Sequence, residues 1–121
     1  MKEIDSLSLL RAQKVADKPM VILLYRDTCH LCHDLMPIYG NISAGITSTL
    51  TKYQNFYIMD ADKNAILTNK FTDGGVPTIL LFKDNKCVEV PYPKEGYTEN
   101  YLVNYFISFD IDKEFGNESF V

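Results

Sequence analysis

The chain contains a continuous apolar run, Met20–Tyr25, that is bounded by turn-forming residues on both sides. Pro19 precedes the run, and Asp27-Thr28 follow shortly after it. The length of the run does not distinguish a strand from a helix by periodicity, but these flanking residues favour a strand. Because no polar position interrupts it, we expect a strand that is buried on both faces, as in a mainly parallel sheet.

Three more strands are predicted further along the chain. Residues 56–60 and 79–82 are short apolar runs of strand length, and residues 87–90 follow the second of them closely. Asp84-Asn85 stands at the centre of the turn between the last two runs. Since these residue types suit the backbone of a tight turn, we expect the third and fourth strands to form a hairpin.

Apolar residues at intervals of three and four predict the helices. The first helix is expected to begin at a cap, Asp5 or Ser6, and to end at Lys18-Pro19. Its predicted apolar positions are Leu7, Leu9, Leu10 and Val15. The longest periodic segment is residues 30–53, and Pro37 lies inside it. Proline removes a helical hydrogen bond and clashes with the preceding turn, so we expect one kinked helix or two short ones.

A short helix over residues 61–71 and a last helix opening at Tyr97 or Thr98 complete the order α-β-α-β-α-β-β-α. This order predicts an α/β fold with a central mixed four-stranded sheet flanked by helices. A chain of 121 residues is long enough for one domain with its own core. We expect residues 1–109 to form that domain and residues 110–121 to be an acidic, flexible tail.

The formal net charge of −4 excludes some partners. A nucleic-acid-binding domain usually has a basic face, so no nucleic-acid partner is expected. No apolar run approaches the roughly 18 residues of a membrane helix. The charged residues Lys2, Glu3 and Asp5 at the start of the chain do not fit the apolar stretch of a signal peptide. These features predict a cytoplasmic protein without a membrane partner.

The chain has three cysteines, Cys29, Cys32 and Cys87. The first two stand at the predicted strand-to-helix junction, where a spacer of two residues brings both sulfurs within bridging distance. A cysteine at the start of a helix lies near unpaired N–H groups and the positive end of the helix dipole, which favour its thiolate. This Cys-x-x-Cys pair predicts a redox site. Cys87 is expected to be a small apolar residue in a strand.

Cys29, His30, Cys32 and His33 also have the side-chain types of a zinc site. Adjacent residues of a helix point about 100° apart, so all four cannot converge on one ion while the segment stays helical. A second ligand pair is missing, because Cys87 is the only other cysteine. Neither a metal nor a cofactor is therefore expected, and an iron–sulfur cluster between two subunits is the weaker alternative.

Together with the residues that follow it, the Cys-x-x-Cys motif makes this chain resemble members of the thioredoxin superfamily. Pro37 follows the second cysteine by five residues, where members carry the proline that kinks the active-site helix. Residues 60–62 (Asp-Ala-Asp) look like the family's segment after its second strand, and residues 75–78 (Gly-Val-Pro-Thr) are close to its cis-proline stretch. The loop 92–97 is faintly similar to the end of protein disulfide isomerase domains. The resemblance covers roughly residues 20–109.

The resemblance implies a thioredoxin-like fold and thiol–disulfide exchange. Cys29, at the exposed end of the helix, would be the attacking thiolate, and Cys32 would resolve the mixed disulfide. The family's cis-proline would be Pro77. Val76 would then offer backbone groups to an extended substrate segment.

The substrate-binding set implied in this way consists of Thr28, Leu31, Gly75, Val76 and Pro77. Two positions beside it depart from the family pattern. Thr28 stands where thioredoxins carry a tryptophan, and Leu23 stands where they carry a buried acid that moves a proton to and from the second sulfur.

The dipeptide between the cysteines, His30-Leu31, also differs from the family's usual pairs. A protonated His30 beside Cys29 would stabilise the thiolate and make the disulfide more oxidising. His30 is therefore expected to modulate catalysis, and the reduction potential is expected to exceed that of a reducing thioredoxin.

Three functions remain open. The first is a monomeric thiol–disulfide oxidoreductase that needs no cofactor and works on protein dithiol/disulfide substrates with a reductase or oxidase partner. The second is a thioredoxin-like protein-binding module with an idle or regulatory Cys-x-x-Cys, which Thr28 and Leu23 favour. A glutaredoxin-type enzyme is the third, weakened because nothing after Pro77 resembles the segment with which glutaredoxins hold glutathione. The intact motif favours the first.

Overall fold

A five-stranded sheet forms the centre of the computed structural model, which describes residues 1–116. Its order is β1-β3-β2-β4-β5, and the strands are β1 (Lys2–Glu3), β2 (Met20–Tyr25), β3 (Asn55–Asp60), β4 (Thr78–Lys83) and β5 (Lys86–Val90). β3 pairs parallel with β1 and β2, whereas β4 pairs antiparallel with β2 and β5. The predicted mixed α/β sheet is confirmed. It has one strand more than the four expected, because β1 is too short to produce a periodic pattern.

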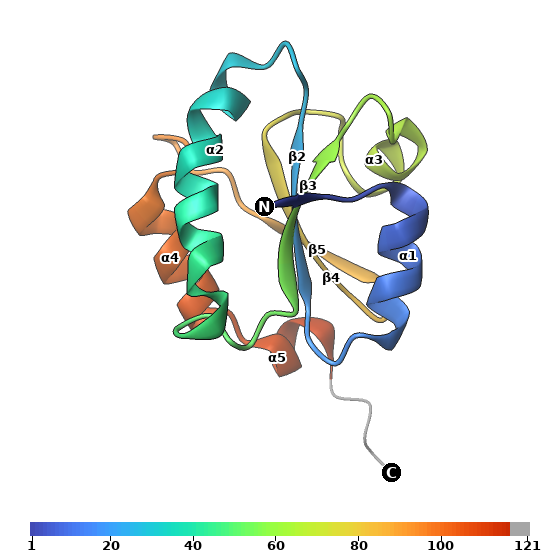
Figure 1. The fold of residues 1–121 in the computed structure, drawn as a ribbon, viewed down its shortest axis with the longest axis vertical. Helices are drawn as coiled ribbons and strands as arrows, with labels where there is room; N and C mark the ends of the chain where they lie inside the picture. Colours follow the sequence, from blue (N-terminus) through green and yellow to red (C-terminus); the bar gives the residue numbers. More distant parts are fainter. Residues whose placement is uncertain (117–121) are drawn as a thin grey trace.

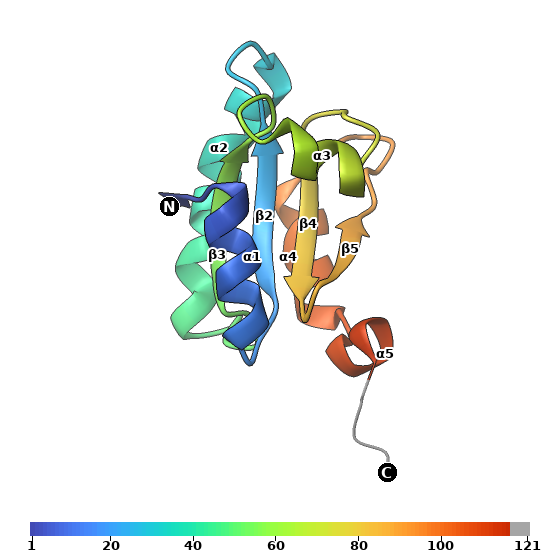
Figure 2. The ribbon, with the colours of Figure 1, turned by 90° about the vertical axis from the view of Figure 1, so that its right-hand side faces the viewer.

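Helices lie on both faces of this sheet (Figure 1). α1 (Ser6–Val15) and α3 (Ala65–Phe71) cover one face, while α2 (His30–Ser43) and α4 (Glu99–Ser108) cover the other. A 3-10 helix (Ala44–Thr47) extends α2, and α5 (Ile111–Phe115) follows α4. Figure 2 views the sheet from the side of α1 and α3. None of the helices within residues 1–116 is long and apolar enough to cross a membrane.

The strand β2 is buried on both faces, as its uninterrupted apolar run predicts. Met20, Ile22 and Leu24 belong to the core on the side of α1 and α3. Val21 and Leu23 belong to the larger core on the side of α2 and α4. The central strand therefore joins the two halves of the core. The loop that leads to Cys29 begins where this strand ends.

The helix boundaries follow local hydrogen bonds. Asp5 caps α1 by accepting a hydrogen bond from the Ser8 N–H at 2.8 Å, and α1 ends at Val15, before the expected Lys18-Pro19 step. The third helix begins later than predicted, because the Asp60 carboxylate accepts the backbone N–H groups of Asp62 and Lys63 and holds a turn there. α2 runs through Pro37 without a break, and its 3-10 extension ends well before residue 53.

The predicted apolar face of α1 is partly wrong. Leu9 is buried, but Leu7, Leu10 and Val15 are exposed. Gln13 is buried instead, where its side-chain amide exchanges hydrogen bonds with Asn85 in the β4–β5 turn. A polar side chain that ties the helix to the hairpin thus takes a core position, and three apolar side chains remain outside.

The residues just after α4 also differ from the expectation of a flexible tail beginning at Asp110. Asp110 caps α5 by accepting the Lys113 N–H at 3.1 Å. Phe115 is buried, and its ring lies 5.9 Å from that of Phe109. Lys86 Nζ donates a hydrogen bond of 2.9 Å to the Phe115 carbonyl. Residues 117–121 of the expected tail lie outside the described residues.

Candidate active site

The two cysteines of the Cys-x-x-Cys motif form a disulfide at the N-terminal end of α2. Their Cα atoms are 5.2 Å apart, in the usual range for a disulfide. Cys29 is the N-cap residue of α2, and its Sγ accepts a hydrogen bond from the Cys32 N–H at 3.1 Å. Cys29 is half-buried, whereas Cys32 has no exposed surface. Of the two cysteines, only Cys29 therefore has any exposed surface.

The position at which the resemblance places a buried acid holds an apolar side chain in this structure. Leu23 is completely buried, in the same core as Leu35 and Ile79. A leucine can neither donate nor accept a proton. Proton transfer at Cys32 therefore has no carboxyl group to use at this position.

The two histidines point to different partners. His30 Nε2 lies 3.2 Å from Asp34 Oδ2, one turn further along α2, and its side chain is 87% exposed. His33 Nε2 lies 2.6 Å from the Asp27 carbonyl oxygen. Because a carbonyl oxygen can only accept, this nitrogen of His33 carries a hydrogen. His33 thus holds the loop that leads into Cys29, a role that the sequence did not predict.

The peptide bond between Val76 and Pro77 is cis, as the resemblance implied. Gly74 has a φ of +91°, which only glycine adopts readily. The Gly75 N–H donates to Asp73 Oδ1 at 3.0 Å, and Thr78 Oγ1 donates to the Gly75 carbonyl at 2.6 Å. Within residues 1–116, no hydrogen bond joins the Val76 backbone to another residue. Its N–H and C=O are therefore available to an extended peptide.

Leu31 and Pro77 line one shallow groove of about 140 Å³, together with the rings of Tyr92 and Tyr97. The Leu31 side chain is 56% exposed there. Thr28 is exposed on the loop before Cys29 and is not among the residues that line the groove. The structure thus brings Leu31 and Pro77 together, while Gly75 lies in the adjoining loop rather than in the groove itself.

Arg26 is a residue of this site that the sequence did not reveal. Its Nε donates to Asp62 Oδ1 at 2.8 Å, and its Nη1 donates to the Gly74 carbonyl at 2.8 Å. It therefore joins the loop after β2 to the loop before β4, which lie at the same end of the sheet (Figures 1 and 2). The sequence feature that could have identified Arg26 is its position, a charged residue directly after a buried strand.

The third cysteine is not part of the site. Cys87 lies in β5, packs against the core on the side of α1 and α3, and is not disulfide-bonded. Burial, and to a lesser degree the charge of Glu89, raises the pKa of the Cys87 thiol to about 12. The thiol therefore stays protonated at neutral pH and is a poor nucleophile. No group of three or more His, Cys, Asp or Glu side chains in residues 1–116 is arranged to hold a metal ion.

Comparison with protein families and with curated proteins shows which proteins this chain is similar to. The family model described as Thioredoxin matches residues 10–107. Thioredoxin Y2, chloroplastic, of Arabidopsis thaliana is 30% identical over 71 residues, which are 59% of this chain and 40% of that protein. Thioredoxin-like protein 4B of Homo sapiens is 26% identical over 98 residues, which are 81% of this chain and 60% of that protein. The chain thus spans 40% and 60% of the lengths of these two relatives.

Solved structures support the fold. Mitochondrial thioredoxin 3 from Saccharomyces cerevisiae, in its oxidised form, superposes with a TM-score of 0.70 at 16% identity, covering 90% of this chain and 95% of that one. The first thioredoxin domain of mouse protein disulfide-isomerase A4 gives a TM-score of 0.68 at 16% identity, covering 98% and 76%. With the family model matching most of its length and a disulfide in the Cys-x-x-Cys position, this chain belongs to the thioredoxin family.

Proposed function

We propose that this protein is a thiol–disulfide oxidoreductase that exchanges electrons with protein dithiols through Cys29 and Cys32. One observation carries the proposal: the disulfide joins a half-buried cysteine at the N-cap of α2 to a fully buried cysteine one turn into the helix. Only one sulfur can be attacked from outside, and the other is held ready as its exchange partner. The reaction needs no cofactor, since the two cysteines hold both electrons.

In the reducing direction, the Cys29 thiolate attacks one sulfur of a substrate disulfide. A bond forms between Cys29 and that sulfur, the substrate S–S bond breaks, and the other substrate sulfur leaves as a thiolate. The Cys32 thiolate then attacks Cys29 Sγ, forms the intramolecular disulfide and expels the second substrate thiolate. The substrate gains two electrons and the pair loses two. In the oxidising direction, the same steps run backwards.

The position of each sulfur fits its proposed role. A thiolate at Cys29 would lie where the Cys32 N–H already points at it and where the helix dipole is positive. His30 is proposed to modulate this charge from the helix surface. Because Leu23 replaces the family's acid, we expect removal of the proton from the Cys32 thiol to limit the resolving step.

The substrate is proposed to bind as an extended segment along the groove beside Cys29. The unpaired backbone groups of Val76 would pair with it as a short strand. Leu31 and Pro77 would contact its apolar side chains, while Thr28 and Gly75 would flank it on the two loops. These contacts would place a substrate disulfide over Cys29, the half-buried cysteine of the pair.

The proposed partners are protein dithiols or disulfides and a reductase or oxidase that resets the Cys29–Cys32 pair. The proposed state is a monomer in the cytoplasm. Three cysteines with one left unpaired do not make the disulfide framework of a small secreted domain. The net charge of −4 supports the absence of a nucleic-acid partner.

Insulin reduction tests the proposal. The protein is expected to accelerate the precipitation of insulin by dithiothreitol, because the Cys29 thiolate attacks disulfides faster than an ordinary thiol does. The variant Cys87→Ser should keep the full rate, since Cys87 lies outside the site. If the protein does not exceed dithiothreitol alone, the enzyme proposal is wrong and a binding module remains.

A second prediction concerns Arg26. The variant Arg26→Ala removes both hydrogen bonds that tie the loop before β4 to the loop after β2. The loop that carries Val76 is then no longer held in place relative to Cys29. We therefore expect KM for insulin to rise about tenfold, which corresponds to the free energy of about one charge-assisted hydrogen bond. Reduction of a small aromatic disulfide, which does not need the groove, should change little.

The variant Arg26→Lys is the matched control, because lysine keeps the charge but cannot reach both acceptors with a planar fork. It should restore part of the affinity. An equal loss of rate with insulin and with the small disulfide would show that Arg26 acts on the cysteines or on folding, not on substrate positioning.

A further inference from the structure

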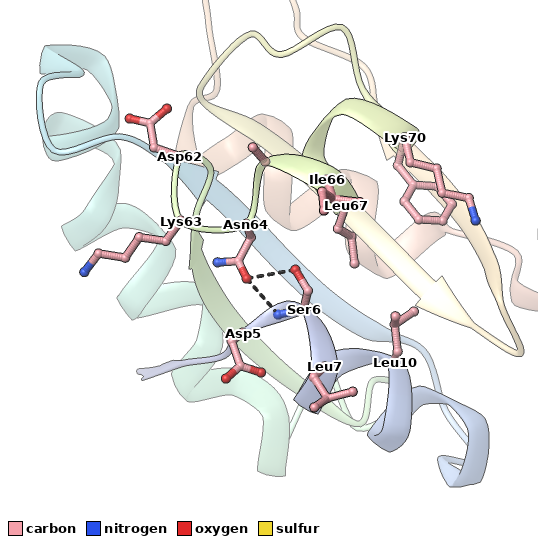
Figure 3. Close-up of a pocket in the computed structure, with 12 residues that line it drawn as sticks. Asp5, Ser6, Leu7, Leu10, Asp62, Lys63, Asn64, Ile66, Leu67 and Lys70 are labelled. Carbon is pink, nitrogen blue, oxygen red and sulfur yellow. Dashed lines mark hydrogen bonds between the residues drawn. The ribbon is translucent and has the colours of Figure 1, made fainter.

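A second cavity lies between α1 and α3 (Figure 3). These two helices cover the face of the sheet opposite α2 (Figure 1). We call it the α1–α3 groove. Its volume is about 700 Å³, against about 140 Å³ for the groove beside Pro77. Its apolar lining comes from Leu7, Leu10, Ala65, Ile66, Leu67 and Phe71.

The groove exposes large apolar side chains that a monomer would be expected to bury. Leu7 is 58% exposed, Leu10 39% and Ile66 90%. Leu7 and Leu10 are two of the residues whose spacing predicts a buried helix face, and the chain buries Leu9 and Gln13 in their place. Within residues 1–116, nothing covers them. Contiguous exposed apolar surface of this kind is typical of an interaction site.

The walls of the α1–α3 groove are held in place before anything binds. Asn64 Oδ1 accepts hydrogen bonds of 2.8 Å from both the N–H and the hydroxyl of Ser6, so the starts of α1 and α3 are joined (Figure 3). At the other end of α3, the ring of Phe71 packs edge-on against Phe82 of β4 at 5.1 Å. A partner would therefore meet a preformed surface and avoid the cost of ordering it.

The charges around the groove favour an acidic partner. Asp62 is neutralised by Arg26, and Asp5 caps α1 and feels the charge of Arg11. Lys63 and Lys70, which stand on either side of the apolar residues in Figure 3, have no carboxylate within ion-pair distance among the described residues. With Asp62 offset by Arg26, the charges left on this rim are those of Asp5, Lys63 and Lys70, which sum to +1 on a chain whose net charge is −4.

We propose that the α1–α3 groove binds an amphipathic acidic helix of a partner protein. The apolar face of that helix would enter the groove between α1 and α3, as in helix-in-groove recognition. Carboxylates beside that face would pair with Lys63 and Lys70. The groove lies on the face of the sheet opposite α2, so the partner would leave Cys29 open to substrates.

The test uses the full chain and three helix-stabilised peptides with the same leucine positions and with glutamate, glutamine or lysine at every polar position. Binding is followed by NMR shifts of the backbone amides. The glutamate peptide should bind with shifts confined to α1 and α3, and about tenfold more tightly than the glutamine peptide. The lysine peptide should bind most weakly. Binding should be the same in Cys29→Ser, so the result does not depend on the proposed enzyme activity.

Three variants sharpen the test without touching the core. Ile66→Glu should abolish binding of the glutamate peptide, whereas Ile107→Glu, at a side chain that is 53% exposed on α4, should not. The double variant Lys63→Glu/Lys70→Glu should reverse the preference toward the lysine peptide. The proposal is overturned by equal affinity for all three peptides, by shifts beside Pro77 instead of α1 and α3, or by a dimer of the free chain that occupies the groove.

Discussion

The variant Cys32→Ser is expected to stop turnover and to leave a stable mixed disulfide between Cys29 and a substrate protein. Cys29 keeps its position at the N-cap of α2, so the first attack on the substrate disulfide still occurs. Serine cannot attack a disulfide, so the mixed disulfide is not resolved. Incubation with insulin should give one covalent adduct per protein molecule in a non-reducing mass spectrum, and dithiothreitol should remove it.

The variant Cys29→Ser is the matched comparison. It should form no adduct and should not accelerate insulin reduction, because the remaining Cys32 sulfur has no exposed surface. The assigned roles would be contradicted if Cys29→Ser formed the adduct, or if Cys32→Ser turned over insulin at the full rate.

The variant Phe106→Ala is expected to lower the free energy of unfolding by about 3–5 kcal/mol. Phe106 is fully buried on α4, and its ring meets those of Tyr53 and Phe56 edge-on at 5.4 and 5.3 Å. Truncation leaves a cavity at the centre of the larger core, which cannot close without moving α4. Urea unfolding of the oxidised protein measures the change.

The neighbouring variant Ile107→Ala serves as the control, because this side chain is 53% exposed on the same helix. It should change the free energy of unfolding by no more than about 0.5 kcal/mol. If the two variants were equally mild, α4 would not pack against the sheet as described.

Patterns that arise within one element were predicted well from the sequence. β2 has no polar position, and the structure buries it on both faces. Asp84 and Asn85 have positive φ angles of 52° and 66°, as a tight hairpin turn requires. The spacing of Cys29 and Cys32 predicted their disulfide, and the resemblance to the thioredoxin superfamily implied the cis bond before Pro77.

Features that depend on distant parts of the chain were missed. The two residues of β1 become a strand only by pairing with β3. The bridge from Arg26 to Gly74 joins residues 48 positions apart. Gln13 takes a core position because Asn85 meets it there, and no periodic pattern predicts a buried polar pair. Phe115 was assigned to a tail because its partner, Phe109, becomes visible only in three dimensions.

The reduction potential of the Cys29–Cys32 pair tests the central claim most directly. It is measured by equilibrating the protein against dithiothreitol and glutathione buffers and weighing the alkylated protein by mass spectrometry. The account predicts one reversible two-electron transition with a midpoint between about −270 and −120 mV, the range of exchange-active pairs. The proposed effect of His30 on the Cys29 thiolate would place the value above the lower limit of this range. A pair that stays oxidised below about −300 mV would be a structural disulfide. That result, or the absence of any disulfide, would contradict the assignment of Cys29 and Cys32 as a redox site.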